Sequence, residues 1–206
     1  MKSFNNFLIE EKGKTIIHKL KWPEADNFTG TEMSFKKKIR VATQYSKRIG
    51  KGSARDVFEI DYEKKPTVMK IAKNEKGFRQ NLAEVNIYKK FRKRPPFMVP
   101  MLSFDDNKDA DTSWIHLMKA NKFNEGEFYR FFGISFSEFR KVLSDIINNQ
   151  ENEHKENKQV KEFVKFIKKA DLMLGEYRQE SNWMTYMSKP VIVDAGITKT
   201  NYEIAY

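Results

Sequence analysis

The chain has 206 residues with a formal net charge of +11, and 39% of its residues are hydrophobic. Its 17 Phe residues supply ample apolar surface for a packed core, which argues against an intrinsically disordered chain. No apolar run approaches the roughly 18 residues that a membrane span requires, and zero Cys exclude disulfides and thiolate metal sites. This length suits one domain, or two small lobes that share a cleft.

The first half of the chain predicts strands and one helix. Residues 1–45 carry no readable pattern and are treated as an N-terminal extension. Apolar and β-branched residues over 57–60 and 66–72 predict two strands. Apolar residues then recur every three or four positions over 78–91, which predicts a helix that ends at "RPP". Two further strands are expected in "FMVPMLSF" and "SWIHLM", joined by an acidic loop.

After residue 120 the pattern becomes helical. Ser135 and Glu138 have the spacing of a capping box ahead of one apolar stripe, and a second stripe runs over 160–174. The segment "NWMTYMSKPVIVDAG" then predicts a short β-hairpin. The chain is therefore expected to be α+β, with a sheet-rich lobe over 46–120 and a reduced, mostly helical lobe over 121–206.

One stretch, "IGKGSARDVFEI" at 49–60, places Gly50 and Gly52 directly before a predicted strand. Most such glycine pairs are hairpin turns, and a dinucleotide-binding loop fits badly because its glycines open a helix. The other glycine loop that holds phosphates lies between two strands. Its chemistry requires a lysine on the next strand, an acid on the following helix, and metal ligands further along the chain.

Candidates for the lysine and the acid occur in that order. Lys70 lies between Met69 and Ile71 in a predicted strand, so its side chain points to the opposite face and is expected to enter a cleft. Glu84 lies at the edge of the apolar stripe of the next helix, where a carboxylate needs a cationic partner. The alternatives are a surface strand lysine and an ordinary glutamate on a helix flank.

The metal ligands have candidates near the end of the chain. Asp194 follows three β-branched residues and precedes Ala195 and Gly196, so its carboxylate is held at the end of a stiff strand, which suits a magnesium ligand. Asn182 lies twelve residues earlier, and the predicted hairpin can bring it alongside. The alternative is that "DAG" forms a plain turn.

Together these motifs resemble the protein-kinase-like superfamily over roughly residues 45–200. "IGKGSARDVFEI" is similar to its glycine-rich loop, "VMKIA" to its valine-x-lysine strand, and Glu84 to its helix glutamate. "HLMKA" is similar to the strand that leads into the interlobe hinge, "SN" to the metal-binding asparagine, and "DAG" to the Asp-Phe-Gly motif. The resemblance implies a bilobal fold with ATP and Mg²⁺ bound between the lobes.

The resemblance also implies roles for individual residues. Mg²⁺ is expected at Asn182 and Asp194, and Lys70 and Glu84 are expected to serve catalysis. The nucleotide is expected to contact Gly50, Lys51, Gly52, Ser53, Val57, Lys70, Met118 and Ala120.

Three features depart from the family pattern. Arg55 replaces the third glycine of the loop, and Tyr177 stands five residues before Asn182, where the catalytic aspartate is expected. Tyrosine cannot act as a carboxylate base, so Glu176 is the best substitute by position. The sequence ends twelve residues after Asp194, which predicts that it has no activation segment.

Three functions follow as hypotheses. The first is a minimal kinase that transfers phosphate to a protein acceptor, either itself or a host protein. The second is a pseudokinase, a nucleotide-responsive module whose basic surface binds an acidic protein. The third is a basic nucleic-acid-binding protein, because lysines and arginines cluster in "FKKKIR", in "KKFRKR" and over 155–169; a solvated basic face explains the same clusters.

The source and compartment are inferred from composition. A compact chain rich in Lys and Asn and lacking Cys is typical of bacteriophage or low-GC bacterial proteins. The N-terminus "MKSFNNFLIEEKGK" has no sustained apolar core or cleavage site, so no secretion signal is expected. We therefore expect a cytoplasmic protein, in the host cytoplasm if a phage encodes it, and no membrane association.

Overall fold

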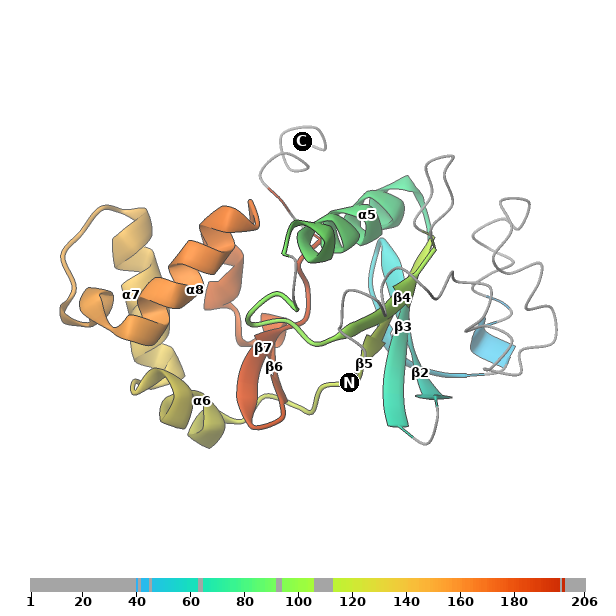
Figure 1. Cartoon of the computed structure of the whole chain (residues 1–206), viewed down its shortest axis with the longest axis horizontal. Helices are drawn as coiled ribbons and strands as arrows, with labels where there is room; N and C mark the ends of the chain where they lie inside the picture. The colour runs from blue at the N-terminus through green and yellow to red at the C-terminus, as the bar shows by residue number, and fades with distance from the viewer. Residues whose placement is uncertain are drawn as a thin grey trace. The chain divides into compact units, whose positions relative to one another are not determined.

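A computed structural model describes residues 40, 42–44, 46–62, 65–91, 94–105, 113–196 and 198 (Figure 1). Apart from positions 40 and 42–44, the expected N-terminal extension lies outside the described residues. The chain is α+β, as predicted, and divides into two compact units. Unit 1 comprises residues up to Arg94 together with Pro100–Lys119, and unit 2 comprises Pro95–Val99 together with the residues from Ala120 onward.

Unit 1 is built on an antiparallel sheet of five strands in the order β1-β2-β3-β5-β4. The strands are β1 (Lys47–Lys51), β2 (Arg55–Tyr62), β3 (Lys65–Ala72), β4 (Met101–Phe104) and β5 (Trp114–Met118). The strands predicted over 57–60 and 66–72 are therefore confirmed. "FMVPMLSF" is a strand only from Met101, and its first residues belong to unit 2.

The two faces of this sheet differ in chemistry because side chains alternate along each strand. One face is buried and largely apolar, with Phe58, Met69 and Trp114 each 0% exposed, and it also carries the buried polar residues Asp56 and His116. The opposite face carries Val57 and Lys70, which are paired across β2 and β3. The sheet therefore presents its candidate phosphate ligand on the face opposite its most apolar layer.

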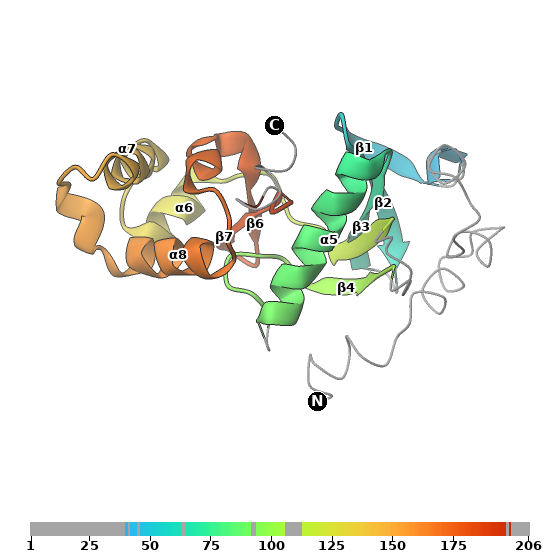
Figure 2. The ribbon, with the colours of Figure 1, turned by 90° about the horizontal axis from the view of Figure 1, so that it is seen from above.

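Helix α5 (Glu75–Lys90) lies along the sheet in Figure 2. It begins where the Asn74 side chain accepts a hydrogen bond from the Gly77 amide at 3.0 Å, and it ends at Lys90 with Phe91 as its C-cap, before the predicted stop. Gly77 allows the helix to approach the turn before β2, because a Cβ there would lie 2.0 Å from the Ala54 carbonyl oxygen. The start of α5 is thus held against the end of the glycine loop.

Unit 2 is mainly helical and ends in a two-stranded sheet. Its elements are α6 (Glu125–Phe132), α7 (Phe136–Ile147), η1 (Glu153–Glu156), α8 (Lys158–Lys169), η2 (Leu174–Arg178), η3 (Glu180–Asn182), β6 (Trp183–Tyr186) and β7 (Lys189–Ile192). The capping box of Ser135 and Glu138 at the start of α7 and the β-hairpin are confirmed.

The second predicted helix was too long. Apolar residues recur as far as Leu174, but α8 ends at Lys169 and Leu174 lies in η2. Asp171 adopts a positive φ of 59°, which a continuing right-handed helix cannot accommodate. Apolar residues therefore keep their spacing although the helix has ended. This occurs because α8 and η2 both contribute side chains to the same core, where Tyr177 packs on Phe163.

Aromatic side chains form the core of unit 2. Phe128, Phe132, Phe139 and Phe163 are all at most 1% exposed and surround Trp183 at ring-centroid distances of 5.0–6.0 Å. Phe97 joins this core from the segment 95–99, lying 5.2 Å from the Phe163 ring, and its carbonyl accepts a hydrogen bond from the Ile192 amide at 2.7 Å. This segment therefore belongs to unit 2 rather than to the sheet-rich part, where the sequence had placed it.

Within the described part of the chain, no helix combines the length and the apolar character needed to cross a bilayer.

Candidate functional site

A row of paired residues crosses unit 1 from the glycine loop to the candidate lysine. Gly50 on β1 pairs with Val57 on β2, and Val57 pairs with Lys70 on β3. A side chain at Gly50 would crowd Val57, because a Cβ there would lie 3.3 Å from the valine Cβ. The sheet register therefore brings together three of the residues that the sequence assigned to nucleotide binding.

Lys70 is held by the carboxylate that the sequence predicted. Its Nζ donates to both Glu84 oxygens at 2.9 Å, and the two residues are 7% and 1% exposed. The alternatives of a surface lysine and an ordinary flank glutamate are therefore excluded for this pair. Burying this ion pair removes both charged groups from water. The desolvation cost offsets much of the attraction, so the pair stabilises the contact between helix and sheet little compared with apolar side chains.

Arg55 supplies a second cation to the same carboxylate. Its Nη1 donates to Glu84 Oε1 at 2.6 Å and to Asn81 Oδ1 at 3.2 Å, and the arginine is 7% exposed. In sequence, Arg55 stood out as a bulky residue at a glycine position of the phosphate loop. In the fold it is the first residue of β2, and its side chain points to α5 and away from the loop.

Burial around Glu84 also affects its helical neighbour. Tyr88 lies one turn further along α5 and is 2% exposed. Burial, and secondarily the negative charge of Glu84, raises the pKa of Tyr88 well above its usual value. Tyr88 therefore remains a neutral part of the core beside the ionised cluster.

Two side chains between β3 and α5 donate hydrogen bonds to the backbone of the glycine loop. Lys73 Nζ donates to the Gly52 carbonyl at 2.9 Å, and Asn74 Nδ2 donates to the Ser53 carbonyl at 3.2 Å. The Gly52 amide closes the turn on the Arg55 carbonyl at 2.8 Å. The side chains of Lys51 and Ser53 remain exposed beside this anchored backbone.

The residues expected at the hinge lie where the two units divide. Met118 is the last residue of β5, is half-buried, and donates its amide to the Pro100 carbonyl at 2.9 Å. Ala120 lies beyond Lys119 and belongs to unit 2. The two residues expected near the adenine therefore lie in different units.

Unit 2 brings Asn182 close to the residue before Asp194. The Val193 amide donates to the Asn182 carbonyl at 3.1 Å, across the base of the β6–β7 hairpin. Asn182 Nδ2 donates to the Glu176 carbonyl at 2.8 Å, which orients the Asn182 amide oxygen away from that carbonyl. Asp194 Oδ1 accepts a hydrogen bond from the Gly196 amide at 3.2 Å, which restrains the carboxylate.

The predicted magnesium ligands, Asn182 and Asp194, form a small donor set. Among the described residues, no group of three or more His, Cys, Asp or Glu side chains is arranged to hold a metal ion. Mg²⁺ commonly takes only one or two protein carboxylates and completes its octahedron with water and substrate phosphates. One carboxylate and one amide oxygen could therefore contribute to a Mg²⁺ site only together with water or phosphate ligands.

Tyr177 has a structural position. It is 1% exposed, its ring packs edge-on against Phe163 at 5.7 Å, and its carbonyl accepts the Trp183 indole N–H at 2.9 Å. Its hydroxyl donates to the Asp194 carbonyl at 3.3 Å. Tyr177 thus supports the backbone of the candidate metal ligand, while the neighbouring Glu176 is half-buried.

Two contributions escaped the sequence analysis. The sequence indicated Arg55 only as a departure at a glycine position of the loop, and it did not indicate Asn81 at all. Asn81 is 0% exposed and accepts a hydrogen bond from Arg55. Asn81 precedes Glu84 by three residues, so both lie on one face of α5. Two polar residues at that spacing within an apolar stripe were the available signal.

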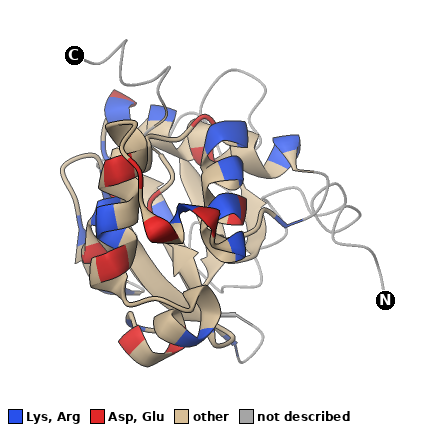
Figure 3. Cartoon of the chain, turned by 90° about the vertical axis from the view of Figure 1, so that its left-hand side faces the viewer, with Lys and Arg blue, Asp and Glu red and all other residues tan. Residues whose placement is uncertain are grey.

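Charge on the outside of the chain is mixed. Figure 3 shows Lys and Arg positions interspersed with Asp and Glu along the helices that face the viewer. Several lysines of α8 are exposed, and Lys161 forms an ion pair with Glu156. The cluster "FKKKIR" lies outside the described residues except for its last position.

A comparison with models of known protein families and a search of curated proteins both found no match.

Proposed function

We propose that this protein binds MgATP and transfers its terminal phosphate to a protein acceptor, as a minimal member of the protein-kinase-like type. The acceptor is the chain itself or another protein of the same cytoplasm. In this proposal Lys70 is the phosphate ligand of unit 1, and Asn182 and Asp194 are the magnesium ligands of unit 2.

The observation that carries the proposal is the buried Lys70–Glu84 bridge in register with Gly50 and Val57. A buried Lys–Glu pair adds little net stability compared with apolar side chains of similar size, so its presence favours a functional reason. A glutamate from the next helix fixes the position of this ammonium, because both of its carboxylate oxygens accept hydrogen bonds from the strand lysine. Such a fixed cation beside a glycine turn is the arrangement that phosphate binding requires.

Each residue has a chemical task in this proposal. Lys70 neutralises phosphate charge, and Glu84 holds its ammonium in place. Val57 and Val68, both half-buried on the same sheet face as Lys70, offer an apolar surface for a base. Bound Mg²⁺ would offset the negative charge that develops on the phosphates. Glu176 is the nearest acid to the usual position of the base, and it would accept the proton of the acceptor hydroxyl.

A second candidate is a pseudokinase, and the core position of Tyr177 favours it. The residue at the usual aspartate position is buried and bonded to the Asp194 carbonyl, so it cannot serve as a base there. Such a protein would bind nucleotide and act by binding an acidic protein partner. Phosphoryl transfer relies largely on positioning and charge, so loss of the aspartate does not by itself prevent transfer.

Nucleotide binding is tested by thermal melting with ATP and Mg²⁺. We expect MgATP to raise the melting temperature of the wild-type chain. Lys70→Met should weaken binding by about 10- to 100-fold, since a charge-assisted hydrogen bond contributes about 1.5–3 kcal/mol. Lys65→Met is the matched control, because Lys65 is an exposed lysine of the same strand, and it should bind like wild type. An unchanged melting curve with MgATP would overturn both candidates.

Transfer separates the two candidates. Incubation with γ-labelled ATP and Mg²⁺ should label the chain or an added acceptor, and Asp194→Ala should remove the label. Glu176→Gln should slow labelling while leaving the MgATP melting shift intact. Binding without label in any acceptor assay would favour the pseudokinase. Binding of DNA or RNA with a steep salt dependence, together with no response to MgATP, would support the nucleic-acid alternative.

A further inference from the structure

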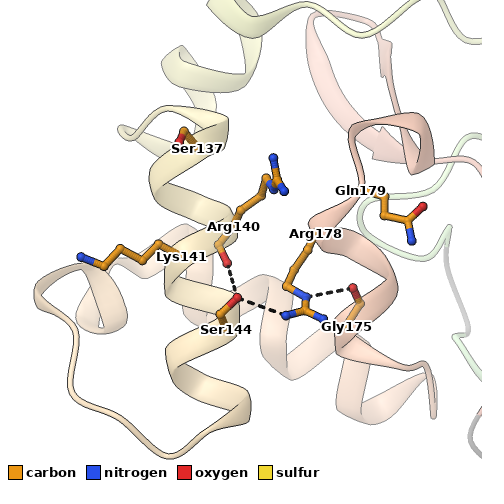
Figure 4. Close-up of a pocket in the computed structure, with 7 residues that line it drawn as sticks. All are labelled: Ser137, Arg140, Lys141, Ser144, Gly175, Arg178 and Gln179. Carbon is orange, nitrogen blue, oxygen red and sulfur yellow. Dashed lines mark hydrogen bonds between the residues drawn. The ribbon is translucent and has the colours of Figure 1, made fainter.

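A pocket of about 520 Å³ opens in unit 2 between α7 and η2 (Figure 4). This volume lies within the range of about 300–1,000 Å³ that small-molecule sites occupy. The pocket is lined by Ser137, Arg140, Lys141, Ser144, Gly175, Arg178 and Gln179. It has no residue in common with the proposed nucleotide site, so the two sites can be tested separately.

The lining carries positive charge and no acid. Figure 4 shows the side chains of Arg140 and Arg178 extending into the space between the two elements, with Gln179 across from them, while Lys141 points away. Neither Arg140 nor Arg178 forms an ion pair with any residue in the described part of the chain. The pocket therefore concentrates two guanidinium groups around one hollow.

The two acidic residues of α7 form hydrogen bonds with other partners, so they do not neutralise the positive charge of the pocket. Glu138 accepts hydrogen bonds from the amide and hydroxyl of Ser135, both at 2.7 Å, at the N-terminus of the helix. Asp145 accepts a hydrogen bond from Asn152 Nδ2 at 2.6 Å. Both carboxylates therefore accept hydrogen bonds from groups other than Arg140.

Arg178 is held in place before any ligand binds. Its Nη1 donates to Ser144 Oγ at 3.2 Å, and its Nε donates to the Gly175 carbonyl at 3.3 Å. Ser144 Oγ in turn donates to the Arg140 carbonyl at 3.1 Å. This chain of hydrogen bonds joins the backbone of α7 to the Arg178 head group, so less side-chain entropy is lost on binding an anion.

The chemistry of the two arginines selects the ligand. A guanidinium presents a planar set of N–H donors that matches phosphate oxygens in pairs. A phosphate monoester carries a charge of about −1.5 to −2 at pH 7, which two arginines neutralise. A nucleic-acid backbone carries one charge per phosphate and is held by a groove that follows several phosphates, whereas this pocket is a single hollow.

We propose that the pocket between α7 and η2 binds a phosphate monoester through Arg140 and Arg178, with Gln179 and Ser137 as neutral hydrogen-bonding neighbours. The monoester comes either from a phosphorylated side chain of a protein or from a small phosphorylated molecule. Binding here does not depend on the MgATP site.

The test is a titration of ¹⁵N-labelled protein with inorganic phosphate, with a short phosphoserine peptide, and with the same peptide unphosphorylated. We expect saturable shifts of the Ser144, Gly175 and Arg178 amide signals with the first two probes and none with the third. Tighter binding of the phosphopeptide than of inorganic phosphate assigns the source to a protein, and equal binding assigns it to a small molecule. A pH change from 7.5 to 5.5 should weaken binding, since the phosphate loses charge near pH 6.

Variants locate the site. Arg140→Gln removes one guanidinium that forms no hydrogen bond or ion pair with the described residues, and it should weaken phosphopeptide binding by about tenfold or more. Arg130→Gln is the matched control, because this arginine of α6 lies in the same unit and its side chain is 74% exposed. Lys70→Met should bind the phosphopeptide like wild type. Equal affinity of Arg140→Gln and wild type, or equal binding of a dinucleotide phosphodiester, would overturn the proposal.

Discussion

Replacing Glu84 by Gln should strongly destabilise unit 1, because the change removes the carboxylate that Arg55 and Lys70 share. Both cations contact the same oxygen, so their nitrogens lie no more than 5.5 Å apart, the sum of the 2.6 Å and 2.9 Å distances to Glu84 Oε1. At an effective dielectric constant of about 20, two unit charges at that separation repel by about 3 kcal/mol. Removing one partner of a buried ion pair typically costs about 3–5 kcal/mol.

We therefore expect Glu84→Gln to lower the free energy of unfolding by about 3–5 kcal/mol. Arg55→Met leaves the Lys70–Glu84 bridge in place, and it should cost about 1.5–3 kcal/mol as the loss of a charged hydrogen bond. The double variant should be less destabilised than the sum of the two single changes, because removing Arg55 relieves the repulsion that Glu84→Gln creates.

Urea unfolding at pH 7, followed by circular dichroism, measures these changes as shifts in the midpoint at constant slope. Added salt should change the differences little, since buried charges are poorly screened. A loss below about 1 kcal/mol for Glu84→Gln, or strict additivity in the double variant, would show that this carboxylate does not organise the cluster.

Two further predictions concern packing and pH. Gly77→Ala should destabilise the chain by about 1–3 kcal/mol, because the new Cβ would lie 2.0 Å from the Ala54 carbonyl oxygen. Gly126→Ala, at an exposed position of α6, should be neutral or slightly stabilising, and equal melting temperatures for the two variants would contradict this account. His116 is 0% exposed, and burial lowers its pKa from 6.5 to about 4. The unfolded state then binds more protons between these values, so stability is present above pH 6.5 and is lost as the pH falls toward 4, by about 3 kcal/mol in all. His116→Gln should flatten this part of the stability curve, and an imidazole NMR titration of His116 near 6.5 would refute the assignment.

Much of the local structure could be read from residue order. The capping box of α7 and the final hairpin are short-range patterns, and each appears where the sequence predicted it. The apolar stripe of α5 is buried at Phe78, Val85 and Tyr88, but Leu82, which belonged to the predicted stripe, is exposed. The contact between Lys70 and Glu84 was also predicted, because a phosphate-binding glycine loop requires a strand lysine and a helix acid that holds it. Strand alternation and helix periodicity indicated only the face on which each side chain lies.

The interpretation of Arg55 depended on distance in space. In sequence, this residue looked like an obstacle within a phosphate loop, and only the pairing of β2 with β3 and the position of α5 place it on Glu84. The need for glycine at position 77 also depends on the tertiary structure, because the Ala54 carbonyl lies where a side chain would be.

The same distinction explains the segment 95–99 and the end of α8. Phe97 lies seven residues after the end of α5 in unit 1, yet its ring packs in the aromatic core of unit 2. The apolar period that ends in Leu174 continues through Asp171, where the backbone turns. Hydrophobic periodicity reports which side chains are buried, because burial depends on side-chain chemistry. It does not report which core receives them or where the helix stops, because both depend on backbone geometry and on partners that are distant in the chain.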